Sequence, residues 1–425
     1  MRRSLRTMNL FTTLSSIPIA ASLILAHARA DDPPQAPVSE RALRVHNAGL
    51  LFDGHNDLPW LLRTEGDWSF TRIDISKRLS KGQTDIPRAR EGGLKAQFWS
   101  VYIPSEHPNP ARTVTEQIDV VHRMVERYPN DLEMAYSADD VERVVKAGKI
   151  ASLIGIEGGA AIEHDLAQLR MFAKLGARYM TLTHNTTLDW ADAANDEPHH
   201  DGLSPFGERV VREMNRLGML VDISHVAPST MADALRISQA PVIASHSSAF
   251  ALCPSPRNVP DDILKLVAKN GGVVMVNFYS GFLMGDAARQ QAEARRSLRA
   301  QYPDDRPAYN RALRAWVKEH PTPRGTVADV ADHIEHIIKV AGIDHVGIGS
   351  DFDGITAWPV GLEDVSCYPR LTEELLKRGH SESDVHKILG GNILRAFRQA
   401  GQVAERLQKT TAPEVDPPGE EKAEG

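Results

Sequence analysis

The sequence predicts an α/β protein folded as a (β/α)8 TIM-type barrel over residues 45–400, with a helical insertion after the seventh strand. Eight short runs of β-forming residues alternate with amphipathic stretches of helical periodicity. Most of the runs are continuously apolar, which is typical of parallel strands buried on both faces. A doubly wound sheet is the alternative, but eight strands favour the barrel because such sheets more often stop at about five to seven.

Each element follows from its local pattern, taken in chain order. The predicted strands are residues 50–53, 96–103, 150–156, 178–183, 219–223, 241–244, 272–278 and 345–349. Helices are predicted at 113–127, 165–175, 204–217, 260–270 and 327–341, where apolar residues recur every three or four positions. A further helix is expected to follow Ser229, a favourable N-cap residue, and to end near Ser238.

Composition and charge exclude several classes of protein. The 425-residue chain has 49 basic and 56 acidic residues, a formal net charge of −7, and 42% hydrophobic residues. This is enough apolar material for a large core, which excludes intrinsic disorder and fibrous folds. The acidic balance argues against a nucleic acid as partner.

The first 30 residues have the pattern of a cleavable signal peptide. Three arginines precede an apolar stretch at 17–26, and Ala-Arg-Ala follows at 28–30. A retained membrane anchor is the alternative, but the stretch is short for a bilayer and contains Pro18 and Ser22. We therefore expect an exported protein, periplasmic or secreted, with no membrane span in its mature chain.

Other segments lie outside the repeating pattern. Residues 31–44 are expected to lead into the barrel, and residues 410–425, rich in proline and glutamate, to form a disordered tail without the hydrophobic end of a lipid-anchor signal. The two cysteines, Cys253 and Cys367, are too few for a metal knuckle. A disulfide between them and two free thiols are both open.

The connection after the seventh strand is unusually long and covers residues 280–325. Two helical stretches are predicted within it, at 287–300 and 308–318. Long βα connections lie at the carboxyl end of a barrel, where active sites are built. The insertion is therefore either a lid over the active site or a surface helical hairpin without a catalytic part.

Polar residues follow six of the eight predicted strands at the end where barrel chemistry is concentrated. A single histidine at such a place is more often structural than functional. The set is harder to dismiss, because the strand ends of a closed barrel converge and the grouped charges need a cation. The candidates are His55, Asp57, Glu157, His184, His225, His246 and Asp351.

Nitrogen and oxygen donors without cysteine predict a Zn²⁺ site, with Mn²⁺ or Co²⁺ as substitutes. His55 and Asp57 are two positions apart on an extended strand, so both side chains can reach one ion. Five donors exceed the needs of one open tetrahedral site, which favours two ions per chain bridged by a carboxylate. Glu157 is the natural bridge.

At these residues the sequence resembles the membrane dipeptidase (renal dipeptidase) family, a dizinc branch of the amidohydrolase-like barrels. The resemblance covers about residues 42–399. It rests on the motifs DGHNDLP (53–59), GIEGG (155–159), TLTHN (181–185), DISHV (222–226), SHSS (245–248), RNVPD (257–261) and GSDFDG (349–354).

The resemblance implies that one zinc is held by His55, Asp57 and Glu157, and the other by Glu157, His225 and His246. It also implies that His184 lies over the substrate carbonyl, that Arg257 binds the substrate and its terminal carboxylate, and that Asp351 accepts a proton from the bridging water. From the residues alone, a loop salt bridge is the more natural role for Arg257. A homodimer is implied by the resemblance only.

The resulting hypothesis is an exported dizinc dipeptidase that hydrolyses the amide bond of free dipeptides through a metal-bridging hydroxide. One alternative is a dimetal amidohydrolase or lactonase acting on another small amide, an ester or a β-lactam. Another is a binding or scaffold protein that kept the barrel and lost the chemistry. Animal members of the family imply a membrane tether and an interchain disulfide, but the few cysteines, the lack of a lipid-anchor signal and the insertion argue against carrying these over.

Overall fold

Eight parallel strands close into a barrel in the structure, a computed structural model that describes residues 36–104, 107–303 and 305–414. Hydrogen bonding runs in the order β2-β1-β9-β8-β7-β6-β5-β4, and pairing of β2 with β4 closes the ring. The predicted barrel is therefore confirmed. The predicted signal peptide and residues 415–425 of the predicted tail lie outside the described residues.

The barrel strands are shorter than most of the apolar runs that predict them, and one extra strand joins them. The bounds are β1 Leu51–Asn56, β2 Leu94–Tyr102, β3 Leu132–Met134, β4 Ile150–Glu157, β5 Ala177–Thr181, β6 Leu220–Asp222, β7 Ile243–Ala244, β8 Val273–Val276 and β9 Val346–Ile348. The unpredicted strand, β3, pairs with the first residues of β4 and lies outside the ring. It has only three residues, which is too short for an alternation pattern to be recognised.

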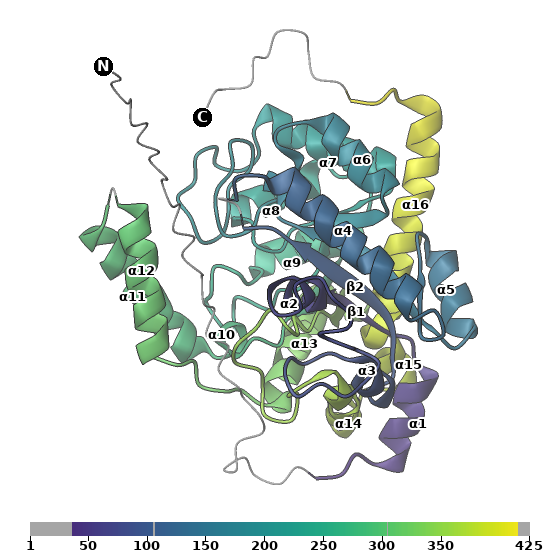
Figure 1. Ribbon diagram of the computed structural model, residues 1–425. Coiled ribbons are helices and arrows are strands. Elements are labelled where there is room, and N and C mark those ends of the chain that lie inside the picture. Colours follow the sequence, from purple (N-terminus) through teal and green to yellow (C-terminus); the bar gives the residue numbers. More distant parts are fainter. Residues whose placement is uncertain (1–35, 105–106, 304, 415–425) are drawn as a thin grey trace, which may run out of the picture.

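Helices connect the strands and cover the outside of the barrel (Figure 1). Their bounds are α1 Glu40–Ala48, α2 Leu58–Thr64, α3 Ile86–Glu91, α4 Pro110–Arg127, α5 Ala138–Lys146, α6 Leu166–Lys174, α7 Pro205–Leu217, α8 Pro228–Ile237, α9 Asp261–Asn270, α10 Ser280–Leu283, α11 Gly285–Gln301, α12 Arg306–Glu319, α13 Val327–Ala341, α14 Tyr368–Lys377, α15 Glu382–His386 and α16 Asn392–Thr410. Short helical turns occupy Gly159–Ile162, Ile343–His345, Val365–Cys367 and Lys387–Gly391.

Among the boundaries that differ from the prediction, three are informative. Helix α8 begins at Pro228 rather than after Ser229, because proline suits the first turn of a helix. The expected lead-in overlaps α1, which buries Ala42 and packs against α14 and α15. At the other end α16 runs past residue 400 and buries Leu407, so the packed domain continues to residue 410.

Aromatic rings fill part of the barrel interior. Phe52 of β1 stacks on Phe98 of β2 with 5.3 Å between ring centroids, and Phe98 lies 4.8 Å from Tyr179 of β5. Strand β4 separates β2 from β5 in the sheet, so the last two rings meet across the interior. Gly155 of β4 leaves room for this contact, since a Cβ atom there would lie 2.0 Å from the Tyr179 ring.

Helices α10, α11 and α12 form the long connection between β8 and α13. Figure 1 shows α11 and α12 beside each other, at the edge of the barrel body. In the part of the chain that the structure describes, no helix combines the length and the apolar character needed to cross a bilayer.

The packing around Gly155 makes a stability prediction. Gly155→Ala is expected to lower the free energy of unfolding by about 3 kcal/mol, because the closed interior cannot move the Tyr179 ring aside without strain. Chemical denaturation measures the change. The matched control is Gly401→Ala in α16, where a Cβ atom meets nothing within 4 Å and the helix should gain stability by about 0.5–1 kcal/mol. Equal stability of the two variants would contradict this account of the interior.

Candidate metal centre

The polar residues predicted at the strand ends converge at the carboxyl end of the barrel. His55 is the last residue but one of β1, Asp57 follows the strand directly, and Glu157 ends β4. His225 and His246 follow β6 and β7. All five side chains are buried, and their chain positions are up to about 190 residues apart, so closure of the barrel is what brings them together.

The Glu157 carboxylate lies between two groups of imidazoles. Its Oε2 atom is 3.4 Å from Nε2 of His55, and its Oε1 atom is 3.1 Å from Nε2 of His225 and 3.6 Å from Nε2 of His246. Ser100 of β2 donates a hydrogen bond of 3.0 Å to Oε2 and fixes the plane of the carboxylate. The two oxygens of one side chain therefore face different ligand groups.

Two further carboxylates complete the His55 side of the cluster. Oδ2 of Asp57 is 3.3 Å from Nε2 of His55, and Oδ1 of Asp351 is 4.0 Å from the same nitrogen. Oxygen or nitrogen atoms of His55, Asp57 and Asp351 lie within 4.8 Å of one another, as do those of His55, Glu157 and His246. Spacings of this size suit ligands around a common ion.

Several nitrogens here lack the partners that a buried polar atom needs. Among the described residues, Nε2 of His55 accepts and donates no hydrogen bond, although the side chain is fully buried. Nε2 of His225 and Nε2 of His246 are 2.8 Å apart, so they cannot both carry a proton. Nitrogen lone pairs directed at carboxylates fit divalent metal ions, and the residues present therefore suit a metal centre.

Hydrogen bonds on the far side of the imidazole rings favour metal binding through Nε2. Nδ1 of His246 lies 2.7 Å from Oγ of Ser245, which donates at 2.6 Å to Asp222. A hydroxyl that donates to Asp222 accepts the Nδ1 proton, which leaves a lone pair on Nε2. Nδ1 of His55 lies 2.9 Å from the Tyr179 hydroxyl, which directs Nε2 of His55 toward the carboxylates.

Burial and neighbouring charges shift the pKa values of the groups at the centre and so set their protonation states. Burial, Arg257 and His184 hold the pKa of His225 well below its usual range, so its ring is neutral. Burial alone would raise the pKa of Glu157, but His55 and His225 outweigh it and hold that pKa well below normal. Glu157 is therefore ionised and His225 is neutral, which are the states that bind a cation.

Asp351 has a different environment. Burial raises its pKa to about 8, the neighbouring carboxylates add to the rise, and His55 opposes it. Nδ2 of Asn277 donates to Oδ2 of Asp351 at 2.8 Å, and this leaves Oδ1 directed at the cluster. A divalent ion nearby would lower this pKa and ionise the group at neutral pH.

The backbone is strained at the same place. His225 has φ 69° and Asp351 has φ 63°, both in the left-handed region that non-glycine residues rarely adopt. Such conformations cost about 1–3 kcal/mol each and cluster at functional sites. The left-handed conformation turns each side chain toward the mouth of the barrel shortly after its strand ends.

Two predicted substrate residues border the cluster. Nε2 of His184 is 3.7 Å from Oε1 of Glu157, and the His184 ring packs against Tyr102 at 4.8 Å between centroids. Arg257 is 2% exposed, hydrogen-bonds to Oγ of Ser247 and to the carbonyl of His246 at 3.4 Å each, and makes no ion pair within the described chain. The expected alternative, a loop salt bridge, is therefore not observed.

Sequence reasoning missed the residues that orient these groups. Tyr179 and Ser100 lie inside apolar strands, where nothing in the local pattern marks a polar contact with the site. Asn277 stands at the end of the seventh predicted strand, and its position was a usable signal. An asparagine at a strand end is a weaker signal than a histidine or a carboxylate, because it carries no charge and is a less common metal ligand.

The cysteines do not pair. Cys253 is buried and Cys367 is partly exposed, and both are free thiols. Sγ of Cys253 contacts the carbonyl of Gly281 at 3.6 Å, whereas Cys367 lies at the start of α14 beside Glu363. The possible disulfide is thus excluded, because each thiol is held by a different part of the fold.

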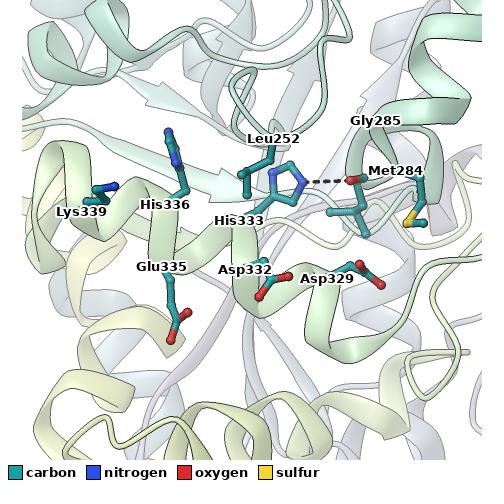
Figure 2. Close-up of a pocket in the computed structure, with 10 residues that line it drawn as sticks. Leu252, Met284, Gly285, Asp329, Asp332, His333, Glu335, His336 and Lys339 are labelled. Carbon is teal, nitrogen blue, oxygen red and sulfur yellow. Dashed lines mark hydrogen bonds between the residues drawn. The ribbon is translucent and has the colours of Figure 1, made fainter.

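A cavity of about 470 Å³ lies away from the metal centre, along helix α13. Figure 2 shows its polar side chains, which are Asp329, Asp332, His333, Glu335, His336 and Lys339. Most already have protein partners: His333 bonds to the Leu283 carbonyl at 3.2 Å, His336 lies 2.8 Å from Asp261, and Arg378 pairs with two of the carboxylates. The convergent donors of the metal centre make that centre the stronger candidate for an active site.

Comparison with known proteins agrees with this geometry. The model of the membrane dipeptidase family, Peptidase family M19, matches residues 39–411. Dipeptidase 3 of Mus musculus is 42% identical over 374 residues, which cover 86% of this chain and 68% of that protein.

Solved structures of dipeptidases are also similar to this chain. The probable dipeptidase PvdM from Pseudomonas aeruginosa superposes with a TM-score of 0.74 at 27% identity, covering 86% of this chain and 98% of the other. A metallo peptidase from Rhodobacter sphaeroides, liganded with a phosphinate mimic of the dipeptide L-Ala-D-Ala, gives 0.67 at 25% identity, with 83% and 99% covered. The resemblance seen in the sequence is confirmed, and the chain belongs to the membrane dipeptidase family of metal-dependent peptidases.

Proposed function

We propose that this protein is an exported dizinc dipeptidase, which hydrolyses the single amide bond of free dipeptides. The observation that carries the proposal is the position of Glu157, whose two oxygens face His55 on one side and His225 and His246 on the other. Family membership supports the hydrolase activity and the dipeptide as substrate class. Two Zn²⁺ per chain and export are the further parts of the proposal.

The ligand sets follow from this position. His55, Asp57 and Glu157 would hold one ion, and Glu157, His225 and His246 the other, as the resemblance implies. Imidazole and carboxylate donors without a thiolate suit Zn²⁺ and admit Mn²⁺ or Co²⁺. When bound, a pair of such ions acidifies a water molecule to serve as nucleophile and polarises the scissile carbonyl.

The remaining roles belong to residues of the chain. Oδ1 of Asp351 accepts a proton while the nucleophile attacks the substrate, and the proton then passes to the leaving amine. Asn277 holds the other oxygen of Asp351 by a hydrogen bond. His184, at the rim of the cluster, donates to the oxygen on which negative charge develops. Arg257 binds the terminal carboxylate of the dipeptide, since its buried guanidinium has no carboxylate partner in the described chain.

Assays on blocked and free dipeptides test this function. A dipeptidase that reads both termini should lose activity when either the amino or the carboxyl group is capped. A dimetal amidohydrolase or lactonase should tolerate the caps and prefer another amide, ester or β-lactam. Equal cleavage of free and doubly capped substrates would therefore favour that alternative.

Export and dimerisation are separate parts of the proposal. The predicted signal peptide at 1–30 should be absent from the protein recovered outside the cytoplasm, with a new amino terminus at residue 31. Mass spectrometry of that fraction tests the cleavage. Analytical ultracentrifugation tests the homodimer, which rests on the family resemblance.

Metal analysis tests the bridging role of Glu157. The parent protein should carry about two divalent ions per chain, and Glu157→Gln should lose both, because the amide removes the charge shared by the two ligand sets. His246→Ala should lose mainly one ion. The exposed Glu126→Gln on α4 is the control and should keep the parental content. Retention of both ions in Glu157→Gln would remove Glu157 from the bridge.

Steady-state kinetics test Arg257. Arg257→Lys keeps the charge but loses the planar fork, so kcat/KM for free dipeptides should fall by about 10- to 100-fold. A C-terminally amidated analogue, already a poor substrate, should change little. Metal content serves as the control and should stay at the parental value. Equal losses on both substrates would mean that Arg257 acts through folding or the metal ligands.

Single-turnover kinetics test Asp351. Asp351→Asn keeps the size and the hydrogen bond from Asn277 but removes the basic oxygen, so turnover should fall by about 10²-fold or more. The metal content should remain near that of the parent. Loss of one ion in step with the activity would make Asp351 a ligand, and full turnover with both ions present would assign proton transfer to another group, such as His184.

A further inference from the structure

The insertion helices and the metal centre meet at one cavity. This cavity, of about 580 Å³, is lined by His184 and Tyr102 on the barrel side and by residues of α11 and α12 on the other. His184 also lies 3.7 Å from Glu157, so it belongs to both the cavity and the metal centre. A molecule bound at the centre therefore has the insertion as the wall of its binding site.

An ion pair holds the insertion against the barrel. Arg299 of α11 lies 3.8 Å from Asp196 and also pairs with Glu197, and both acidic residues belong to the connection between β5 and α7. The Arg299 guanidinium also lies 5.3 Å from the Tyr309 ring of α12. These contacts give the cavity a fixed wall made of two helices and a loop.

The charges of this wall are not balanced. Three guanidinium groups, of Arg295, Arg299 and Arg314, line the cavity together with the carboxylates of Asp196 and Glu197. Arg299 uses both carboxylates, whereas Arg295 and Arg314 form no ion pair or hydrogen bond within the ranges the structure describes. The cavity therefore keeps one net positive charge beside the metal centre, and two guanidinium groups remain available to an anion.

We propose that this cavity is the side-chain pocket of the substrate and that Arg295 and Arg314 select dipeptides carrying a carboxylate side chain. The proposal rests on the function proposed above and names its substrate class. The terminal carboxylate of a dipeptide is already assigned to Arg257, which lies at the base of the centre and not among the cavity residues. A second anionic group must therefore be a side chain, that of aspartate or glutamate.

The volume fits this assignment. Pockets for small ligands commonly span about 300–1,000 Å³, and 580 Å³ is within that range. The guanidinium forks match a carboxylate but not the neutral amide of glutamine, which has nearly the same shape. Discrimination should therefore appear between acidic dipeptides and their amide counterparts.

The test compares isosteric substrates on the metal-loaded protein. The parent should cleave Glu-Ala or Ala-Glu with a kcat/KM about tenfold above that for Gln-Ala or Ala-Gln, and this ratio should shrink as salt rises from 0.05 to 0.5 M, because the arginines are partly solvated. The double variant Arg295→Gln/Arg314→Gln should bring the ratio to about one. The metal content of the double variant should stay at the parental value, which shows that the centre is intact.

Matched variants distinguish an effect of the pocket arginines from an effect of the overall charge of the protein. Arg296→Gln on α11 and Arg311→Gln on α12 remove exposed arginines that do not line the cavity, and they should keep the parental ratio. A ratio near one in the parent, or an equal loss of selectivity in the control variants, overturns the pocket assignment and leaves the dipeptidase proposal standing. Absence of cleavage for neutral and acidic dipeptides alike overturns the proposed function, and the pocket assignment with it.

Discussion

The buried carboxylate of Glu157 is the constraint on which the rest of the centre depends. An ionised group with 4% exposure is costly unless charges and hydrogen bonds surround it. The barrel meets this requirement with Ser100 and with imidazoles on both sides of the carboxylate, at 3.1–3.6 Å. The arrangement leaves nitrogen and carboxylate donors around one point, which suits a member of a family of metal-dependent peptidases.

A second layer of hydrogen bonds fixes the orientation of that first set of groups. The Tyr179 hydroxyl holds His55, Ser245 links His246 to Asp222, and Asn277 holds Asp351. Each partner sits on a barrel strand or directly after one, so the rigidity of the sheet passes to the reacting atoms. Movement of a strand by even a fraction of an ångström would change several of these contacts together.

The insertion adds to this centre without disturbing it. Helices α11 and α12 pack on each other and contribute no residue to the metal cluster, yet they form one wall of the adjoining cavity. The ion pair between Arg299 and the β5–α7 connection is the link between the two parts. The metal cluster and the wall of the adjoining cavity are thus built from separate segments, so the wall can vary while the cluster is kept.

The sequence by itself determined the eight barrel strands, eight of the sixteen helices in the described residues, and the polar residues at the strand ends. Hydrophobicity and its periodicity are local properties of the sequence, so a continuous apolar run such as that of β4 reveals its strand directly. The sequence did not reveal β3, which is too short for a pattern. It also did not reveal the role of Tyr179, a residue of an apolar strand whose hydroxyl contacts a histidine more than a hundred positions away. The distances around Glu157 were decided by the tertiary structure alone, because they arise only when β2 pairs with β4 and the barrel closes.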